Sequence, residues 1–473
     1  MSSPPHPVIH WFRRDLRISD NPALLAAARA TPCVVPVYIP STWNHSHAWT
    51  GPNRQSFLCQ SLGSLSRNLE TRGGRLIFRS GKAVEILMAL AQEVGAQAIY
   101  YNQDPDPFGK SVEIELEKAC IQHGIECHGF HEVTLHGPSE VLTQAGDPYR
   151  VFTPYSKNWL SLEKPLPEGL PASLDTPQHL RSESAPQLKH WSLQAAASGV
   201  LEGGERAAHD RLKTALAERL SLYQGQRDTP SVAGTSRLSQ DLRFGLISIR
   251  KVYAEAAKAL SRARSKTSTG SIETFIKELA WREFYMAILH HFPHVLEEEF
   301  NPDWRGLPWD EPGEKFEAWK AGRTGFPIVD AGMRELRETG FMHNRLRMIT
   351  AMFLTKDLHH DWRWGESYFM QLLTDGEIAS NNGGWQWSAG TGADAAPYFR
   401  IQNPWSQSAR HDPRGEYIRR WIPELKEVPT ARLHEPPSDG RPLAADYPLP
   451  CVEHSKERDR TLAIFKKHKE SRR

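Results

Sequence analysis

The sequence lacks the patterns that mark several broad classes of protein. Its 473 residues include only five cysteines, and no two of them form a Cys-x-x-Cys pair. This usage argues against a disulfide scaffold and a structural zinc site, and it predicts a reducing, cytoplasmic compartment. No run of 18 apolar residues occurs, so no membrane span is expected. Residues 1–7 also lack the charged-then-apolar pattern of a signal peptide.

Motifs of several enzyme classes are missing as well. No Gly-x-Gly-x-x-Gly follows a candidate strand and no Walker A lysine loop occurs, which argues against ordinary dinucleotide and nucleoside triphosphate folds. A Gly-x-Ser-x-Gly nucleophile elbow and a His-Glu-x-x-His zinc motif are also absent. The pairs His290–His291 and His359–His360 are adjacent residues, which point about 100° apart on a helix and do not converge. We therefore expect no metal site.

Tryptophan, by contrast, is abundant. The chain has 15 tryptophans, and ten of them lie between residues 281 and 421. They indicate either a core rich in large rings or an aromatic site that stacks planar ligands or moves electrons. With 39% hydrophobic and 24% charged residues the composition is that of a globular protein, and the length suggests two or three domains. The net charge of +2 permits a nucleic-acid partner without requiring one.

Hydrophobic periodicity divides the chain into three parts. Residues 1–135 alternate short apolar runs with helical patterns, which predicts an α/β domain with a doubly wound parallel sheet. Strands are expected at 8–12, 34–39, 75–78, 98–101 and 125–130, and helices at about 22–30, 55–71, 83–94 and 111–123. Residues 136–206 lose this pattern and contain five prolines between 165 and 186, which is typical of an interdomain linker. Residues 207–473 have helical spacing and predict an all-α domain.

Two segments of the helical part carry polar groups in a suggestive order. Thr235-Ser236-Arg237-Leu238-Ser239 precedes a helical pattern, and its hydroxyls, guanidinium and N–H groups suit a phosphate or pyrophosphate. Taken alone, the segment is more typical of an ordinary Ser N-cap with a solvated arginine. Farther along, Glu278, Trp281 and Tyr285 share one helix face, where a carboxylic acid beside a ring can bind and stack a nucleobase. A core face bordered by Glu278 explains the same spacing equally well.

A further helix is expected to open at His343. Asn344 and Met348 are four residues apart and face together, whereas Arg345 and Arg347 diverge. One arginine can therefore meet a phosphate while the other pairs an internal carboxylate such as Asp375. Two exposed arginines and a surface aspartate would be the commoner arrangement.

The segment Ser380–Trp387 departs furthest from an ordinary surface pattern. Its two asparagines and two glycines predict either a tight turn or a close approach of the backbone to a ligand. If the segment is helical, Trp385 and Trp387 point about 200° apart and can serve two different neighbours. Core packing could still explain both rings.

Together these segments resemble the photolyase/cryptochrome family, most closely the class I cyclobutane pyrimidine dimer photolyases. The resemblance rests on Trp11–Arg17, Thr235–Ser239, Trp281–Tyr285, His343–Met348 and Asn381–Trp387, in collinear order over almost the whole chain. It implies a light-driven DNA repair enzyme of the deoxyribodipyrimidine photolyase type, a monomer that acts on UV-damaged DNA. In such enzymes fully reduced FAD absorbs blue light and passes an electron to a flipped pyrimidine dimer, whose cyclobutane ring then opens.

The resemblance also implies which residues hold FAD. The pyrophosphate would lie on the 235–239 segment, and Asn381 would face flavin N5, where it can control the proton inventory of the cofactor. By the family pattern, Arg347 pairs with Asp375. The other residues that the resemblance places near the cofactor are Tyr223, Phe275, Asn344 and Glu377.

The lesion would bind on the same helices. Glu278 matches the acid that hydrogen-bonds the dimer carbonyl, and Trp281 and Trp387 match the walls that stack the dimer. The resemblance implies lesion or backbone contacts for the remaining matched residues, which are Met348, Asn344, Arg345 and Arg227.

A separate set of rings matches the family's electron relay. Trp385, Trp362 and Trp309 would carry electrons from the surface to an oxidised flavin. Near the expected sheet, Tyr101–Phe108 is more similar to relatives that bind a deazaflavin antenna than to those that bind folate, and an empty antenna site is a third reading.

Two other activities remain open within this family. A cryptochrome-like blue-light receptor would keep FAD without repair, but Asn381, in place of the Asp typical of plant receptors, favours the enzyme. A (6-4) photolyase would have a histidine pair where this chain has Arg345 and Met348. Glu377 stands where many relatives have Asp, and Phe275 where some have Trp, which leaves FAD binding credible.

Overall fold

The N-terminal part is built on a parallel sheet, as predicted. The computed structural model describes residues 6–472. Five strands form one sheet in the order β3-β2-β1-β4-β5, and every neighbouring pair is parallel. The strands are β1 (Val8–Phe12), β2 (Val34–Tyr38), β3 (Ile77–Phe78), β4 (Ala98–Asn102) and β5 (Glu126–Phe130). Each lies within a residue or two of its expected range, although β3 keeps only the last two residues of the predicted strand.

Helices cover both faces of this sheet. On one face Ile9, Val37 and Ile99 pack against α3 (Ala83–Val94) and α4 (Pro107–His123). On the other face Val8, Phe12 and Tyr38 pack against α1 (Pro22–Ala30) and α2 (Pro52–Glu70). Alternate residues of each strand thus enter different cores, which is the pattern of a strand buried on both faces. The doubly wound architecture is confirmed.

The segment between the two parts contains a helix that the sequence pattern did not predict. Helix α5 (Phe152–Ser161) lies within 136–206 and packs against α10. Its buried positions Phe152, Tyr155 and Trp159 follow the spacing i, i+3, i+7 of a helix face. Only ten residues carry that signal, and the proline-rich sequence after it obscures the pattern. The remainder of the segment holds a short 3₁₀ turn, η1 (Leu188–Trp191), and runs without further helix or strand.

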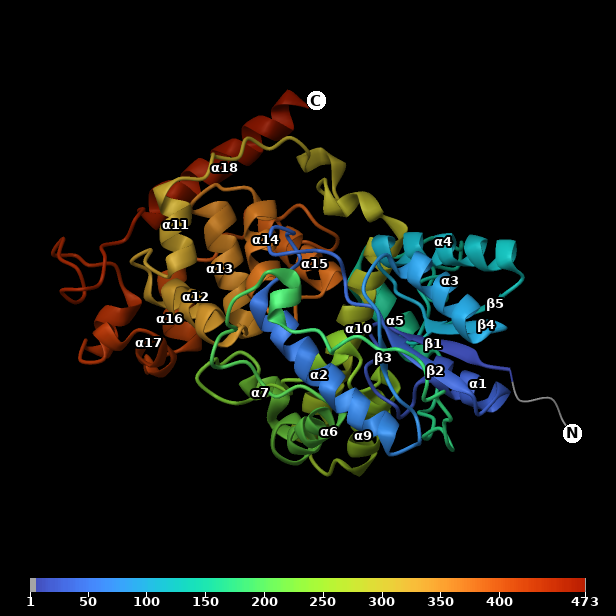
Figure 1. The fold of residues 1–473 in the computed structure, drawn as a ribbon. Coiled ribbons are helices and arrows are strands. Elements are labelled where there is room, and N and C mark those ends of the chain that lie inside the picture. Colours follow the sequence, from blue (N-terminus) through green and yellow to red (C-terminus); the bar gives the residue numbers. More distant parts are fainter. Residues whose placement is uncertain (1–5, 473) are drawn as a thin grey trace, which may run out of the picture.

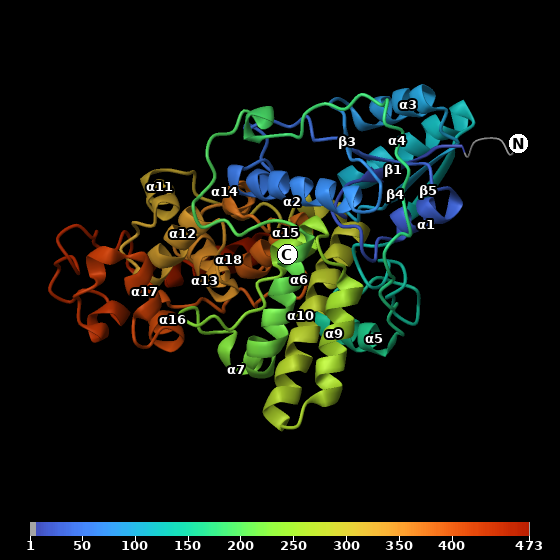
Figure 2. The ribbon, with the colours of Figure 1, turned by 60° about the horizontal axis from the view of Figure 1, so that its bottom comes forward.

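From residue 205 onward the named elements are helical, as predicted. Helices α11, α12, α13, α16 and α17 lie on the side of the molecule away from the sheet, and α14 and α15 lie between (Figure 1). Helices α9 and α10 form an antiparallel hairpin (Figure 2). A π-helical turn, Ala215–Arg219, directly follows helix α6. The helices are α6 (Glu205–Thr214), α7 (Tyr223–Gln226), α8 (Ser239–Phe244), α9 (Ile249–Arg262), α10 (Lys266–His291), α11 (Glu314–Ala321), α12 (Pro327–Thr339), α13 (Asn344–Lys356), α14 (Trp362–Leu372), α15 (Ile378–Ala389), α16 (Pro404–His411), α17 (Glu416–Trp421) and α18 (His454–Ser471).

Two large cores position the site. One core is continuous from the α1–α2 face of the sheet into α8, α9 and α10, and the other fills the space among α11 to α17. Helix α2 joins the two parts, because Arg54 and Asn53 donate hydrogen bonds to backbone carbonyls at the end of α14. Within residues 6–472, no helix combines the length and the apolar character needed to cross a membrane.

Candidate functional site

A cavity of about 500 Å³ lies where the two cores meet, and most of the predicted site residues line it. Its walls come from α7, α8, α10, α13, α14, α15 and the loops that precede them. Such a volume is in the range of small-molecule and cofactor sites. The predicted residues on its lining are Tyr223, Arg227, Ser236, Leu238, Ser239, Phe275, Glu278, Trp281, Asn344, Arg347, Met348, Asp375, Glu377, Asn381, Trp385 and Trp387. Thr235, Arg237, Arg345, Trp309 and Trp362 do not line it.

Helix α10 supplies the longest wall. The helix begins after Ser265, whose side chain accepts a hydrogen bond from the Ser268 N–H, and it runs for 26 residues. Glu278, Trp281 and Tyr285 all line the cavity, and Trp281 and Tyr285 also pack against the neighbouring core, so both interpretations of this face hold in part. The guanidinium of Arg227 donates to Glu278. Burial raises the pKa of Glu278, and the charge of Arg227 opposes that shift.

Aromatic rings support Trp281 from behind. The ring of Phe152, from α5, stacks on Trp281 with 3.7 Å between centroids and 10° between planes. Tyr285 lies 5.5 Å from the same ring. Trp281 itself is only half-buried because it also borders the cavity. Phe152 belongs to the site through this contact, and sequence reasoning missed it because the two residues are far apart in the chain.

Helix α13 brings its two arginines to different carboxylates. The side chain of His343 caps the helix by accepting from the Arg345 N–H, 3.2 Å away. Arg347 donates to both oxygens of Asp375, at 2.8 and 3.1 Å, as the internal pairing predicted. Burial works to raise the pKa of Asp375, but Arg347 outweighs it and holds the pKa below its ordinary value. Arg345 pairs with Asp228 at 2.7 Å, so neither arginine has the solvated, unpaired arrangement.

The 235–239 segment reaches the cavity with Ser236, Leu238 and Ser239 only. Helix α8 begins at Ser239 with Leu238 at the N-cap and without a side-chain cap, so the ordinary Ser N-cap interpretation is wrong. Arg237 has a positive φ of 58° and lies 3.5 Å over the ring of Phe341. Its Nε is buried and has no hydrogen-bond partner in the described part of the chain. The segment is therefore an irregular turn, and the Nε of its arginine has an unused capacity to donate a hydrogen bond.

The segment Ser380–Trp387 is helical, so the predicted tight turn is wrong. The close backbone approach found here is to a neighbouring helix, and an approach to a ligand stays a prediction. Glu377 caps α15 by accepting from the Ser380 N–H. Gly383 lies against Tyr285 of α10, where an added Cβ would fall 2.1 Å from the ring. A side chain at this position would push the two helices apart. Gly383 thus lets α15 lie close to α10, and the cavity opens between aromatic residues of the two helices.

Asn381 and the two tryptophans of α15 all border the cavity. The amide nitrogen of Asn381 donates to the Glu366 carbonyl at 3.1 Å, which fixes the orientation of the side chain. Trp385 is buried, and its Nε1 has no hydrogen-bond partner among the described residues. Trp387 is half-buried on the same cavity. The expectation that the two rings serve separate neighbours is thus only partly met, because both residues line one space.

The cavity fits a flat, anionic cofactor of the flavin type. Phe275, Leu279 and Phe369 give it apolar walls, and the unpaired indole N–H of Trp385 offers a donor. Two further residues that sequence reasoning missed, Arg243 and Arg282, also line it. They donate to the backbone carbonyls of Gly376 and Val133 and form no ion pair within residues 6–472. Burial lowers the pKa of both guanidinium groups, that of Arg243 to about 10. Two cations without carboxylate partners favour an anionic ligand.

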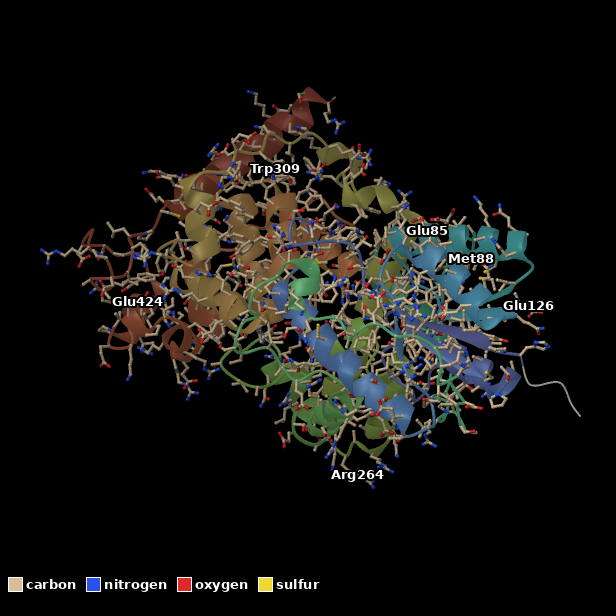
Figure 3. All side chains as sticks on the ribbon, viewed as in Figure 1. Glu85, Met88, Glu126, Arg264, Trp309 and Glu424 are labelled. Carbon is tan, nitrogen blue, oxygen red and sulfur yellow. The ribbon has the colours of Figure 1, made fainter. Side chains whose placement is uncertain are left out.

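The three tryptophans of the predicted relay differ in burial, and the outermost in the predicted order is the most exposed. Trp385 is 2% exposed and Trp362 is fully buried, with its Nε1 3.2 Å from Glu299. Trp309 is half-buried and lies near the C-terminal helix (Figure 3). Among the described residues, the ring contacts of Trp385 are with Phe369, at 5.0 Å, and Trp319, at 6.1 Å.

The predicted antenna segment follows β4 at the carboxyl edge of the sheet. Asp104 pairs with Arg14 at 2.9 Å. Burial and the neighbouring Asp104 raise the pKa of Asp106 to about 7. The side chain of Asp106 also caps α4. These contacts hold the segment in place and leave the identity of any antenna chromophore a prediction. Throughout residues 6–472, no group of three or more His, Cys, Asp or Glu is arranged to hold a metal ion.

Comparison with known proteins matches both parts of the chain. Residues 8–172 match the family model of DNA photolyase, and residues 275–467 match the FAD binding domain of DNA photolyase. A deoxyribodipyrimidine photo-lyase of Synechococcus sp. is 38% identical over 97% of this chain and 96% of its own length. A bacterial class III photolyase from Agrobacterium tumefaciens superposes with a TM-score of 0.92 at 40% identity, covering 99% of both chains. A cryptochrome of Synechocystis sp. superposes with a TM-score of 0.88 at 31% identity, covering 98% of this chain and all of its own.

Proposed function

The chain belongs to the DNA photolyase family, and on that premise we propose that it is a deoxyribodipyrimidine photolyase that repairs cyclobutane pyrimidine dimers in DNA with light. It is an enzyme of this family with a photolyase-type FAD-binding domain. The observation that carries the proposal is the single cavity in which Glu278 and Trp281 of α10 face Asn381 and Trp387 of α15. This cavity combines groups for a flavin with groups for a nucleobase.

The cofactor half of the cavity suits FAD in its fully reduced form. When bound and reduced, FAD supplies the electron that blue light transfers to the dimer and that returns once the ring has opened. Arg243 and Arg282 favour the anionic form of the ligand, because they line the cavity and form no ion pair with a carboxylate among the described residues. Asn381 is held by the Glu366 carbonyl and can keep an oxygen acceptor at a fixed place. Arg347 and Asp375 neutralise one another at the wall.

The lesion half of the cavity suits two coupled pyrimidines. Trp281 and Trp387 offer half-buried ring surfaces for stacking, and Met348 adds an apolar contact. Glu278, whose pKa is raised by burial, can donate a hydrogen bond to a pyrimidine carbonyl in its acid form. Arg227 and Arg345 can reach DNA phosphates by exchanging their present partners, Glu278 and Asp228. A dimer stacks and pairs poorly in the duplex, so flipping it into the cavity costs less than flipping an ordinary base.

The decisive experiment is repair under blue light. The reduced, FAD-loaded protein is illuminated with an oligonucleotide that contains one cyclobutane thymine dimer, and the return of base absorbance is followed against a dark control. We expect absorbance to recover only in the light. A Trp281→Ala variant with intact FAD should repair poorly at low DNA concentration. Full FAD binding without any recovery of absorbance would exclude the repair proposal.

The relay is a separate part of the proposal. Trp385, Trp362 and Trp309 would pass electrons from the surface to oxidised FAD, and the change from buried to half-buried rings supports this direction. Trp385→Phe should slow photoreduction of the oxidised protein and leave repair by chemically reduced protein largely intact. Trp405→Phe, in the same core but packed against Phe326 with 5.0 Å between ring centroids, is the matched control. Wild-type photoreduction in the Trp385 variant would exclude the relay.

Several finer statements complete the proposal. We propose UV-damaged DNA as the partner, a monomer as the working form, and a deazaflavin or folate antenna near Asp104 and Asp106. A cytoplasmic location is supported by the five cysteines, which are all free thiols in the structure.

The alternative is a blue-light receptor, which the likeness to the Synechocystis cryptochrome favours. A protein that changes its flavin state in light but leaves dimers intact would support that alternative.

A further inference from the structure

We propose that Phe152 of α5 is a positioning residue for the lesion wall, which it serves by holding the plane of Trp281. This inference rests on the proposed function, because it assumes that Trp281 stacks the lesion. The segment 136–206 thereby contributes to the site although it was expected only to connect two domains. Helix α5 lies beside α10, the helix that carries Trp281 (Figure 1).

The geometry of the ring pair is the main observation. The rings of Phe152 and Trp281 are nearly parallel, at 10°, and their centroids are 3.7 Å apart. One face of Trp281 is therefore covered by Phe152, while the residue also borders the cavity. Phe152 is 8% exposed and does not line the cavity, so it has no direct route to a ligand. Its contact can affect a bound lesion only through Trp281.

A third ring locks this pair in place. Phe284 lies edge-on to both Phe152, at 5.8 Å, and Trp281, at 5.6 Å. Tyr155, one turn along α5, packs on Phe284 at 5.2 Å. Edge-to-face contacts of this kind fix the orientation of a ring more strongly than general apolar burial does. The plane of Trp281 is thus set by α5 as well as by α10.

Helix α5 is anchored at both ends. At its N-terminus, the Phe152 N–H donates to Asp394 at 3.4 Å, and Asp394 lies on the loop that follows α15. Near its C-terminus, the indole N–H of Trp159 donates to Glu283 of α10 at 2.6 Å. Since α15 carries Trp387, Asp394 links the supports of both proposed lesion walls. Helix α5 therefore links α10 to the loop after α15, and α10 and α15 are the two helices whose rings would hold the dimer. We call this link the brace.

The test is a double-mutant cycle on DNA affinity with the FAD-loaded, full-length protein. Affinities are measured for a duplex with one cyclobutane thymine dimer and for the same duplex without damage. We expect Phe152→Leu to weaken binding to the damaged duplex about threefold to tenfold, the usual worth of an aromatic pair. Binding to the undamaged duplex should change less than about twofold, because backbone contacts do not involve this ring. Phe152→Tyr keeps the stacking ring and should restore dimer affinity.

The cycle separates positioning from general stability. In a Trp281→Ala background, Phe152→Leu should have no further effect on dimer affinity, because the residue through which it acts is gone. Phe465→Leu removes a buried ring of α18, away from the cavity, and should leave dimer affinity unchanged. If Phe152→Leu misfolds, Asp394→Ala loosens the start of α5 while keeping the ring, and it should weaken dimer binding by a smaller factor.

The outcomes distinguish two claims, that Phe152 positions Trp281 and that Trp281 stacks the lesion. If Trp281→Ala weakens dimer binding but Phe152→Leu does not, the brace is wrong and the lesion wall stands. The brace is also wrong if Phe152→Leu is equally harmful with and without Trp281, or if it weakens both duplexes alike. If Trp281→Ala itself leaves dimer affinity unchanged, the lesion wall of the proposed function fails first.

Discussion

The two glutamates of α10 illustrate how one helix serves two different regions. Glu278 faces the cavity, is about one-third exposed, and pairs with the single cation of Arg227. Glu283 lies little more than one turn away on the opposite side and is fully enclosed. It accepts hydrogen bonds from the Leu135 and His136 N–H groups and from the Trp159 indole. Burial raises the pKa of both carboxyls, that of Glu283 to about 7.

The difference between them lies in how completely the neighbours satisfy each carboxylate. Glu283 has three donors, two from the backbone and one from a ring, so it joins α10 to the segment that follows β5 and to α5. Glu278 has one side-chain partner, the partly exposed Arg227, and it lines a cavity that can admit a ligand. A buried acid with full partners stabilises a fold, whereas an acid with spare capacity at a cavity is available for binding. A shifted pKa alone does not distinguish the two.

The largest effect is expected when Glu283 is removed. Glu283→Ala leaves three buried donors without an acceptor, and each orphaned group costs about 1–3 kcal/mol. The free energy of unfolding should therefore fall by about 3 kcal/mol or more, measured by urea denaturation. Glu278→Ala is the matched control and should shift the urea midpoint much less. Equal losses in the two variants would contradict the comparison.

A smaller effect on the free energy of unfolding is expected when the pH is changed, because Glu283 gains or loses its proton. The pKa of Glu283 is about 7 in the folded protein against an ordinary 4.5, so the folded state holds the proton more tightly. Its contribution to stability is complete below about pH 4.5 and is lost as the pH rises through about 7. The loss amounts to up to about 3 kcal/mol at 1.36 kcal/mol per unit. Glu283→Gln should flatten the plot of unfolding free energy against pH between about pH 4.5 and 7. An unchanged plot would show that the pKa of Glu283 is not raised.

On the cavity side, the ring next to Glu278 should govern binding rather than stability. Trp281→Ala should weaken binding to dimer-containing DNA by about 1–3 kcal/mol, the value of a lost stacking ring. Binding to undamaged DNA should barely change. Trp421→Ala, which removes a half-buried ring outside the cavity, is the control in the same titration. An unchanged affinity for damaged DNA in the Trp281 variant would remove the lesion-wall assignment.

The smallest effect concerns Glu278 itself. Because its pKa is raised, the acid form becomes more populated as the pH falls, and only that form can donate to a pyrimidine carbonyl. Affinity for the dimer should rise toward low pH in the wild type. Glu278→Gln should lose this pH dependence and change affinity by about 1 kcal/mol, the net worth of one hydrogen bond. A pH profile that survives the substitution would assign the titration to another group.

Most of the correct predictions about the fold rest on sequence patterns within a few residues. The five strands and the first four helices follow alternation in the sequence, because strand and helix periods depend on nearby residues. The shared face of Glu278, Trp281 and Tyr285 follows from helix geometry alone. The pairing of Arg347 with Asp375 was expected and is present. The assignments of individual residues to FAD, lesion and relay remain predictions.

The errors occurred where local patterns gave conflicting signals. The glycines at 383 and 384 suggested a turn, yet α15 continues through them because Gly383 gains close packing against Tyr285. Helix α5 went unnoticed because it is short and lies beside a proline-rich stretch. No sequence pattern pointed to Arg243 and Arg282, and only the tertiary structure places them on the cavity wall.

The sequence by itself determined the layout of a parallel α/β part followed by helices, and which side chains share a face on α10. These features depend on the repeat of the backbone over a few residues. Only the tertiary structure decided that Glu283 is a fully satisfied internal acid, that Glu278 opens onto a cavity, and that Phe152 covers the back of Trp281. Those roles depend on contacts between segments far apart in the chain, and no short-range period encodes which distant groups will meet.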